Sequence, residues 1–189
     1  IDRRTLAQIL LAAWPDAAHV VRRRKRAVAW SNGGTELELG RASAIDEDKA
    51  ECAIVLDSLA LTVSHRKNPL VITAAMPVPP KWLVDAGLGR RRLAAPLVER
   101  GRVMARVEIV HAGRVLATEE ARPQGEMLRE TVRDLVLANR IFKGAGAALK
   151  TRLERLGLQA GLDDAPQPAA APEWLLERLG DLGLEDPDE

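Results

Sequence analysis

The chain has 189 residues, 47% of them hydrophobic, which is enough for one substantial core with helical additions. No apolar run reaches the roughly 20 residues needed to cross a membrane, and a single cysteine excludes a disulfide framework and favours a reducing cytoplasm. The net charge of +1 conceals an uneven distribution, because residues 163–189 carry −8 and residues 1–162 carry +9. A basic body favours nucleic acid as a partner, with ordinary surface charge as the alternative.

The first predicted element is a helix over residues 2–13, where apolar side chains recur at helical spacing. Asp2 is a candidate N-cap, and Pro15 stops the helix. The chain begins at Ile1 without a methionine, so we interpret it as an excised piece of a longer protein. On this interpretation residues 1–15 are the end of an upstream helical domain.

Residues 16–122 are expected to form a β-rich domain. A basic strand over residues 18–30 runs into the strong turn signal Ser31-Asn32-Gly33-Gly34. Pro77 is expected to end the strand that begins at Leu70. Residues 81–100 are ambiguous beyond a short helical start. The other predicted strands cover residues 35–39, 52–63, 102–110 and 114–119.

From Glu126 onwards the hydrophobic period becomes helical. Residues 123–160 are expected to form a helical extension, and its first helix carries an apolar stripe that runs as far as Phe142. A second helix follows and ends at Gly157. Residues 161–189 are interpreted as an acidic linker and the start of a truncated following domain.

These elements predict an α+β fold that is mainly β. The short strands, with one basic face, favour a small antiparallel OB-like barrel flanked by an N-terminal helix and C-terminal helices. A β-sandwich is the alternative.

A run of five cations is the strongest functional signal. No acid lies between Asp16 and Glu36, and apolar strand residues follow the run at once, so we expect a basic edge on a folded domain rather than a solvated tail. Such an edge suits a phosphate backbone. With four tryptophans, one phenylalanine and no tyrosine, base reading is disfavoured. The run comprises Arg22, Arg23, Arg24, Lys25 and Arg26.

No catalytic signature accompanies this run. The sequence contains no phosphate loop, HExxH, CxxC or nucleophile elbow. Gly144-Ala145-Gly146 is interpreted as a hinge or helix start, and Asp46-Glu47-Asp48 as a solvated loop, with a nucleotide site and a metal site as the respective alternatives. Cys52 lies in an apolar strand and is expected to be an inert thiol. No catalytic, cofactor or metal residue is therefore predicted in this chain.

The order of motifs resembles a known family. Residues Leu10-Leu11-Ala12-Ala13-Trp14-Pro15-Asp16, the basic stretch and Ser31-Asn32-Gly33-Gly34 resemble the start of the C-terminal OB-type region of DEAH-box helicases, in particular the bacterial HrpB-type branch. The stretches Ile54–Ala60 and Leu70–Pro77 also fit, as does the predicted hairpin of residues 105–120. The resemblance covers roughly residues 5–156.

The resemblance implies an accessory part of a cytoplasmic helicase rather than its motor. The partners would be single-stranded RNA or DNA and the RecA-like motor domains of the same chain, which would hold ATP and Mg; no membrane is implied. The predicted nucleic-acid contacts are Arg22 to Arg26, with Arg66 and Lys67 in a later turn. The alternatives are a protein-interaction module that binds no nucleic acid and, less favoured, a stand-alone enzyme.

Overall fold

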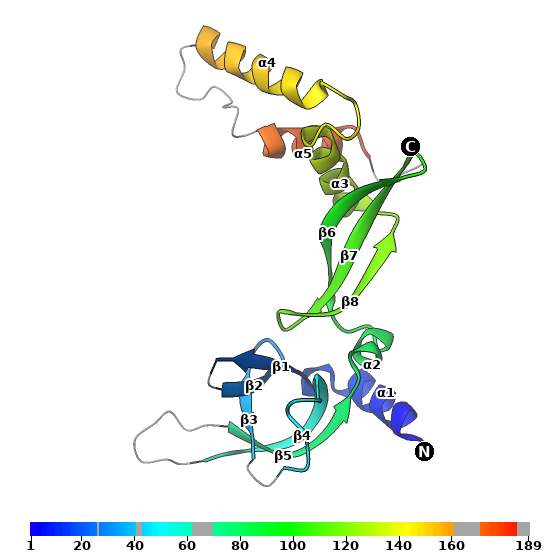
Figure 1. Cartoon of the computed structure of the whole chain (residues 1–189), viewed down its shortest axis with the longest axis vertical. Coiled ribbons are helices and arrows are strands. Elements are labelled where there is room, and N and C mark those ends of the chain that lie inside the picture. Colours follow the sequence, from blue (N-terminus) through cyan, green and yellow to red (C-terminus); the bar gives the residue numbers. More distant parts are fainter. Residues whose placement is uncertain (26, 41–42, 62–69, 161–170, 185–189) are drawn as a thin grey trace. The chain divides into compact units, whose positions relative to one another are not determined.

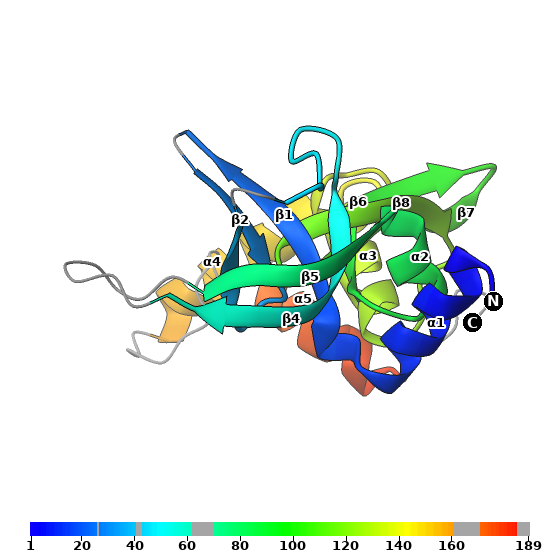
Figure 2. The same ribbon diagram turned by 90° about the horizontal axis from the view of Figure 1, so that it is seen from below.

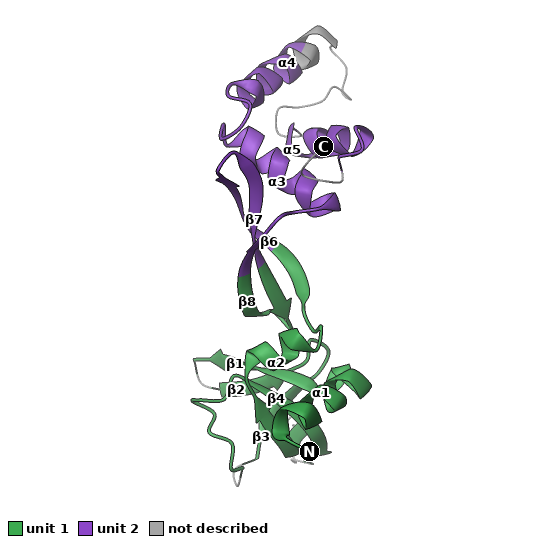
Figure 3. Cartoon of the chain, turned by 90° about the vertical axis from the view of Figure 1, so that its right-hand side faces the viewer, with its two compact units in different colours: residues 1–92, 108–118 green, residues 93–107, 119–189 purple. Residues whose placement is uncertain are grey.

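The structure, a computed structural model, describes residues 1–25, 27–40, 43–61, 70–160 and 171–184. The chain is mixed α+β and divides into two compact units (Figure 3). Unit 1 comprises residues 1–92 and 108–118, and unit 2 comprises residues 93–107 and 119–189. The four-part division expected from the sequence stays a prediction. Within the described ranges, no helix has both the length and the apolar character that a membrane crossing requires.

Five strands form a closed barrel in unit 1 (Figure 1). Their order around the barrel is β1-β2-β3-β5-β4. Strand β1 pairs antiparallel with both β2 and β4, whereas β3 and β5 are parallel. The expected all-antiparallel barrel is therefore wrong at this closure, because β4 lies between β3 and β5 in the sequence and returns the chain before β5 begins. The five strands are β1 (Ala18–Arg24), β2 (Ala27–Ser31), β3 (Glu36–Leu39), β4 (Cys52–Ala60) and β5 (Leu70–Val78).

The strands depart from the sequence prediction most clearly in two places. The single strand expected over residues 18–30 is a hairpin, since Arg24 pairs with Ala27 and the chain reverses between them. Strand β5 does not end at Pro77, which pairs with Ala53 in the ladder. A proline is tolerated in a strand where the ladder does not need its N–H group.

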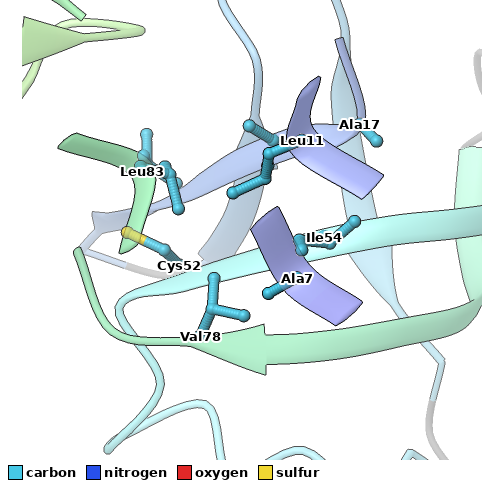
Figure 4. Packing of buried hydrophobic residues seen from close by; sticks show 9 residues of the cluster. Ala7, Leu11, Ala17, Cys52, Ile54, Val78 and Leu83 are labelled. Carbon is cyan, nitrogen blue, oxygen red and sulfur yellow. The ribbon is translucent and has the colours of Figure 1, made fainter. Parts of the chain in front are cut away.

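The barrel has one core inside and another outside. Inside, Trp30 is fully buried among apolar residues of all five strands. Outside, helix α1 (Arg3–Ala13) and helix α2 (Pro80–Asp85) cover β1, β4 and β5 (Figure 4). The two helices lie side by side in Figure 2, and Leu11 and Leu83 are the largest side chains that they bury in this outer cluster.

The N-terminal helix follows the sequence prediction. It begins after Asp2, whose side chain accepts hydrogen bonds from the backbone N–H groups of Arg4 and Thr5, so the expected N-cap is confirmed. A short 3₁₀ helix, η1 (Pro15–Ala17), links it to β1. The entry of the chain into the barrel is thereby fixed by local hydrogen bonds.

A separate three-stranded sheet has the order β6-β7-β8. It consists of β6 (Arg90–Glu99), β7 (Arg102–His111) and β8 (Arg114–Ala121), and its residues belong to both units. The predicted β7–β8 hairpin is confirmed, while β6 occupies the stretch that the sequence left ambiguous. The β7–β8 turn belongs to unit 1, where Ala112 and Leu116 pack against the outer cluster.

Unit 2 also holds three helices. Leu128, Val132 and Val136 of α3 form a small core with Leu175 and Leu179 of α5, which confirms the apolar stripe of α3. The stripe does not reach Phe142, because α3 ends at Leu137 and Phe142 is exposed. The helices are α3 (Gly125–Leu137), α4 (Ala145–Ala160) and α5 (Ala171–Asp181).

Candidate nucleic-acid interface

The β1–β2 hairpin brings the predicted basic residues to one end of the barrel. Arg22, Arg23 and Arg24 are the last residues of β1, and exposed Lys25 begins the turn to β2. The other predicted contacts, Arg26, Arg66 and Lys67, lie outside the described residues.

Alternation along β1 separates the three arginines. Ala18 and Val20 face the outer cluster and Val21 faces the barrel interior, so Arg22 and Arg24 continue the outer face and Arg23 the inner one. The run therefore does not present a uniform row of cations.

Arg22 and Arg24 both bind the carboxylate of Glu36 on β3. Arg22 Nη1 donates to Glu36 Oε1 at 3.0 Å, and Arg24 Nη2 donates to Oε1 at 2.7 Å and to Oε2 at 3.1 Å. We call these two side chains on Glu36 the arginine fork. The Arg24 side chain is 61% exposed, and ion pairs that exposed contribute about 0–1 kcal/mol to stability. A phosphate can therefore compete for the same guanidinium groups.

Arg22 has a second, structural role. Its Nη2 and Nε donate to the carbonyl oxygen of Ala112 at 2.6 and 3.3 Å. Ala112 has a φ of +47° in the β7–β8 turn, so the guanidinium holds a strained turn against β1. Only part of the hydrogen-bonding capacity of Arg22 is left for a ligand.

Arg23 is occupied by the loop that precedes β4. Its Nη2 donates to the carbonyl oxygens of Glu47, Asp48 and Ala50 at 2.6, 3.1 and 3.2 Å. Backbone carbonyls in a loop need such donors when no strand partner is present. Arg23 thus fastens this loop, and Arg24 and Lys25 are the described members of the run most available to a ligand.

Two partners of this site were missed at the sequence level. Glu36 was recognised only as an outward residue of an alternating strand. Arg114 was not singled out, yet its Nη1 donates to the carbonyl oxygen of Val21 at 3.2 Å and its Nη2 to Glu51 Oε1 at 2.6 Å. Glu36 lies on β3 of the barrel and Arg114 on β8 of the three-stranded sheet, so both pairings join residues far apart in sequence and no local sequence signal predicts them.

A buried histidine lies at the opposite end of β1 from the fork. His19 Nδ1 lies 2.9 Å from the carbonyl oxygen of Ala17, so Nδ1 carries the proton and donates. Nε2 is buried and has no partner among the described residues. Burial lowers the pKa of His19, the Ala17 carbonyl opposes that shift, and the nearby His111 lowers the pKa further.

The lowered His19 pKa predicts a pH-dependent stability. His19 of the unfolded chain binds a proton near pH 6.5, whereas His19 of the folded chain binds it only at lower pH. The contribution of neutral His19 to the free energy of unfolding is therefore complete above pH 6.5 and is lost as the pH falls below that value. Urea unfolding followed by circular dichroism between pH 5 and 7.5 measures this slope. His19→Gln should flatten it, and an unchanged slope in that variant would assign the dependence to another group.

Two further groups of unit 1, Cys52 and Asp46, are shielded or engaged. Cys52 is fully buried, as expected, and burial raises its pKa to about 12. Asp46 pairs with Lys49 at 3.0 Å, and this contact holds the pKa of the Asp46 carboxyl below its usual value. Among the described residues no group of three acidic, histidine or cysteine side chains is placed to hold a metal ion.

Comparison with known proteins shows a likeness to a solved structure but no match to a family model or a curated protein. No family model matches the chain, and no curated protein matches its sequence. Among solved structures, the chain is similar to the crystal structure of the DExH-box NTPase HrpB from E. coli, with 18% sequence identity and a TM-score of 0.46. The likeness covers 97% of this chain and 24% of that protein, so the chain spans about a quarter of the length of the solved structure it matches.

Proposed function

We propose that this chain is a non-catalytic accessory region of an ATP-dependent helicase of the DEAH-box, HrpB-like type, and that it contacts the backbone of single-stranded RNA or DNA. The observation that carries the contact is the end of the β1–β2 hairpin, where Lys25 is exposed and Arg24, the more exposed member of the arginine fork, is paired with Glu36. Arg26, Arg66 and Lys67 belong to the proposed site on the sequence alone.

The strand arrangement supports an OB-type barrel. Five strands close with β1 between β2 and β4, and β3 runs parallel to β5. OB-type barrels bind oligonucleotides with the β2–β3 face and with the β1–β2 and β4–β5 loops. Lys25 and Arg26 fall in the first of these loops, and Arg66 and Lys67 fall in the sequence between β4 and β5. Four of the seven predicted residues thus fall, by sequence position, in the two connections that OB-type barrels use, while Arg22, Arg23 and Arg24 lie in β1.

Backbone contact, rather than base reading, suits the chemistry of the hairpin end. Trp30 is the aromatic residue nearest to the run in sequence, and it is fully buried in the barrel. Guanidinium groups are good donors to phosphate oxygens, and Arg24 Nη2 already donates to both carboxylate oxygens of Glu36. The proposed contact is therefore largely independent of sequence.

The helicase part of the proposal rests on the order of sequence motifs. In such helicases the RecA-like motor domains would bind ATP and Mg and would supply the rest of the nucleic-acid channel, in the cytoplasm. This chain would contribute one wall of that channel and no catalytic group. Its isolated affinity should then be modest and strongly dependent on salt.

Reversing the two most available charges tests the proposed contact. Arg24→Glu with Lys25→Glu should weaken the binding of the 189-residue chain to a fluorescently labelled single-stranded RNA, as measured by anisotropy at two salt concentrations. Each lost phosphate contact should reduce the slope of log affinity against log salt by about 0.7. The lost contacts should lower affinity in the same way for unrelated RNA sequences.

A control of equal charge separates a site from bulk charge. Arg90→Glu with Arg102→Glu makes the same change at two exposed residues on the β6-β7-β8 sheet. Equal loss of binding in both double variants would show that only net charge matters and would remove the named site.

The alternative is docking to a protein. Strand β4 exposes Leu56 at 42% and Leu59 at 56%, and Leu61 beyond it is 42% exposed. These apolar side chains give a partner something to bury. Binding to a protein partner that is insensitive to salt, with no binding to RNA at low salt, would favour this alternative.

A further inference from the structure

We propose a second contact with single-stranded nucleic acid at the α3–α4 corner, residues 138–144, where Phe142 stacks on a base and flanking cations bind the adjoining phosphates. The inference rests on the proposed function, because it assigns a further site for the same class of ligand. It concerns unit 2 alone and uses no residue of the β1–β2 hairpin.

Phe142 is exposed and does not belong to the hydrophobic core of α3 and α5. It is the only phenylalanine of the chain and is 72% exposed. The preceding residue, Ile141, packs against the core of α3 and α5, but Phe142 is not part of that core. An isolated exposed apolar residue is common, so its exposure alone decides nothing.

The backbone of Phe142 supplies the second observation. Its φ is +45°, in the left-handed region that bulky side chains rarely adopt, and Asn139 three residues earlier has a φ of +58°. Asparagine adopts this region readily but phenylalanine does not, so Phe142 is the strained position of the corner. Strain of this kind persists where the surrounding structure enforces it, and it concentrates at binding sites.

Hydrogen bonds on both sides hold the corner in this conformation. The N–H group of Arg140 donates to the carbonyl oxygen of Leu135 at 2.8 Å, and that of Gly144 donates to Asn139 Oδ1 at 2.6 Å. The N–H group of Ala145 donates to the carbonyl oxygen of Phe142 itself at 2.9 Å. The ring is therefore presented on a fixed backbone, which lowers the entropy cost of binding.

The cations of the corner and of the following helix differ from those of the β1–β2 hairpin. Residues 138–155 contain five cations and a single acid, Glu154. All five cations are exposed, and within the described residues none of their side chains makes an ion pair or a hydrogen bond, in contrast to the engaged arginines of β1. The five are Arg140, Lys143, Lys150, Arg152 and Arg155.

This combination indicates a single-stranded polyanion with aromatic rings. Proteins that bind single strands combine a basic surface with exposed aromatic side chains on which unpaired bases stack. An acidic peptide would satisfy the cations but would leave the phenylalanine ring without a partner of its own kind. In a duplex the bases are already stacked on each other, so their faces are not available to Phe142.

The substitution Phe142→Gly separates binding from stability. Glycine adopts a positive φ without strain, so the melting temperature of this variant should equal or exceed that of the original chain. Its affinity for a labelled single-stranded RNA should nevertheless fall roughly tenfold. Phe142→Leu keeps an apolar side chain without an aromatic face, and it should lose binding to a similar extent.

Matched variants complete the experiment. Leu182→Ala removes another exposed apolar side chain of unit 2, 81% exposed, and should leave affinity unchanged. Arg140→Glu with Lys143→Glu should weaken binding and reduce its salt dependence. Ultraviolet crosslinking of an RNA that contains 4-thiouridine, followed by mass spectrometry, should identify the peptide that carries Phe142.

The possible outcomes distinguish this inference from the proposed function. Loss of binding in the Phe142 variants with full binding in Arg24→Glu/Lys25→Glu supports the corner and removes the hairpin site. The reverse result overturns the corner and leaves the hairpin. Unchanged RNA binding in Phe142→Leu also overturns the inference, whereas an acidic peptide should bind the original chain and Phe142→Leu equally.

Discussion

Replacing Trp30 with alanine is expected to destabilise the barrel by about 3–5 kcal/mol. Trp30 is fully buried, pairs with Val21 on β1 and with Leu37 on β3, and is the largest side chain inside the barrel. Its removal leaves a cavity that the closed ring of strands cannot collapse to fill, because each strand is hydrogen-bonded on both sides. The loss is comparable to the whole stability of many small domains.

Cys52 provides a readout for this prediction that is specific to the barrel. It is the only cysteine of the chain, lies in β4 and is fully buried with a pKa raised to about 12. Cys52 belongs to the outer cluster beneath α1 and α2, so alkylation of its thiol requires this cluster to open, as it does when unit 1 unfolds, whatever the state of unit 2. In Trp30→Ala the alkylation rate at pH 8 should rise by orders of magnitude, and the urea midpoint measured by circular dichroism should fall.

The matched control is Trp30→Phe. The indole Nε1 is buried without a hydrogen-bond partner among the described residues, so phenylalanine removes an unsatisfied donor while it retains most of the ring volume. Its cost should stay below about 1.5 kcal/mol. Equal alkylation rates in the two variants would contradict the packing role assigned to Trp30.

The second large effect is expected at Gly89, which precedes β6. Its φ is +104°, and a Cβ atom there would lie 2.7 Å from Cγ2 of Ile109. Gly89→Ala therefore combines backbone strain with a collision against a buried residue of β7, and we expect a loss of about 2–5 kcal/mol. Differential scanning calorimetry should show a lower melting temperature for unit 1.

A neighbouring glycine separates the two contributions. Gly87 has a φ of +77°, and a Cβ atom there would have no neighbour within 4 Å. Gly87→Ala should therefore cost only the backbone term, about 1–2 kcal/mol. If the two alanine variants melt at the same temperature, the close approach of Gly89 to Ile109 has no energetic weight.

Elements with purely local causes could be predicted from the sequence. Helix α1 and its Asp2 cap depend on residues within one turn of each other, and the β7–β8 hairpin depends on alternation around a short turn. The same holds for the short helical start expected from residue 81, which is α2. In each case the sequence positions that determine the element lie close together along the chain.

Other features depend on partners far along the chain. The chain reversal between β1 and β2 could not be predicted, because the basic residues and the apolar residues that follow them have the pattern of one continuous strand. Strand β5 passes through Pro77 because β4 pairs with it over its whole length. Strand β6 carries three consecutive arginines and a proline, which obscure its alternation, yet it pairs with β7.

The candidate site shows the same division. The identity of the basic residues could be read directly, but their roles could not. Arg23 fastens a loop 24 to 27 residues away, and Arg22 holds a turn 90 residues away. The Phe142 ring was assigned to a helix stripe because its spacing from Leu128 and Leu135 is helical, while the positive φ of Asn139 stops that helix earlier.

Any anion that binds the arginine fork must displace the Glu36 carboxylate that already occupies it. A single small anion gains little from displacing a carboxylate that is already tethered at high effective concentration. A chain of linked phosphates displaces the carboxylate only once, and its other phosphates then make further contacts at Lys25 and the neighbouring loop. The fork should therefore discriminate by the length of the anion, ignoring free phosphate and engaging polymers, without reading any base.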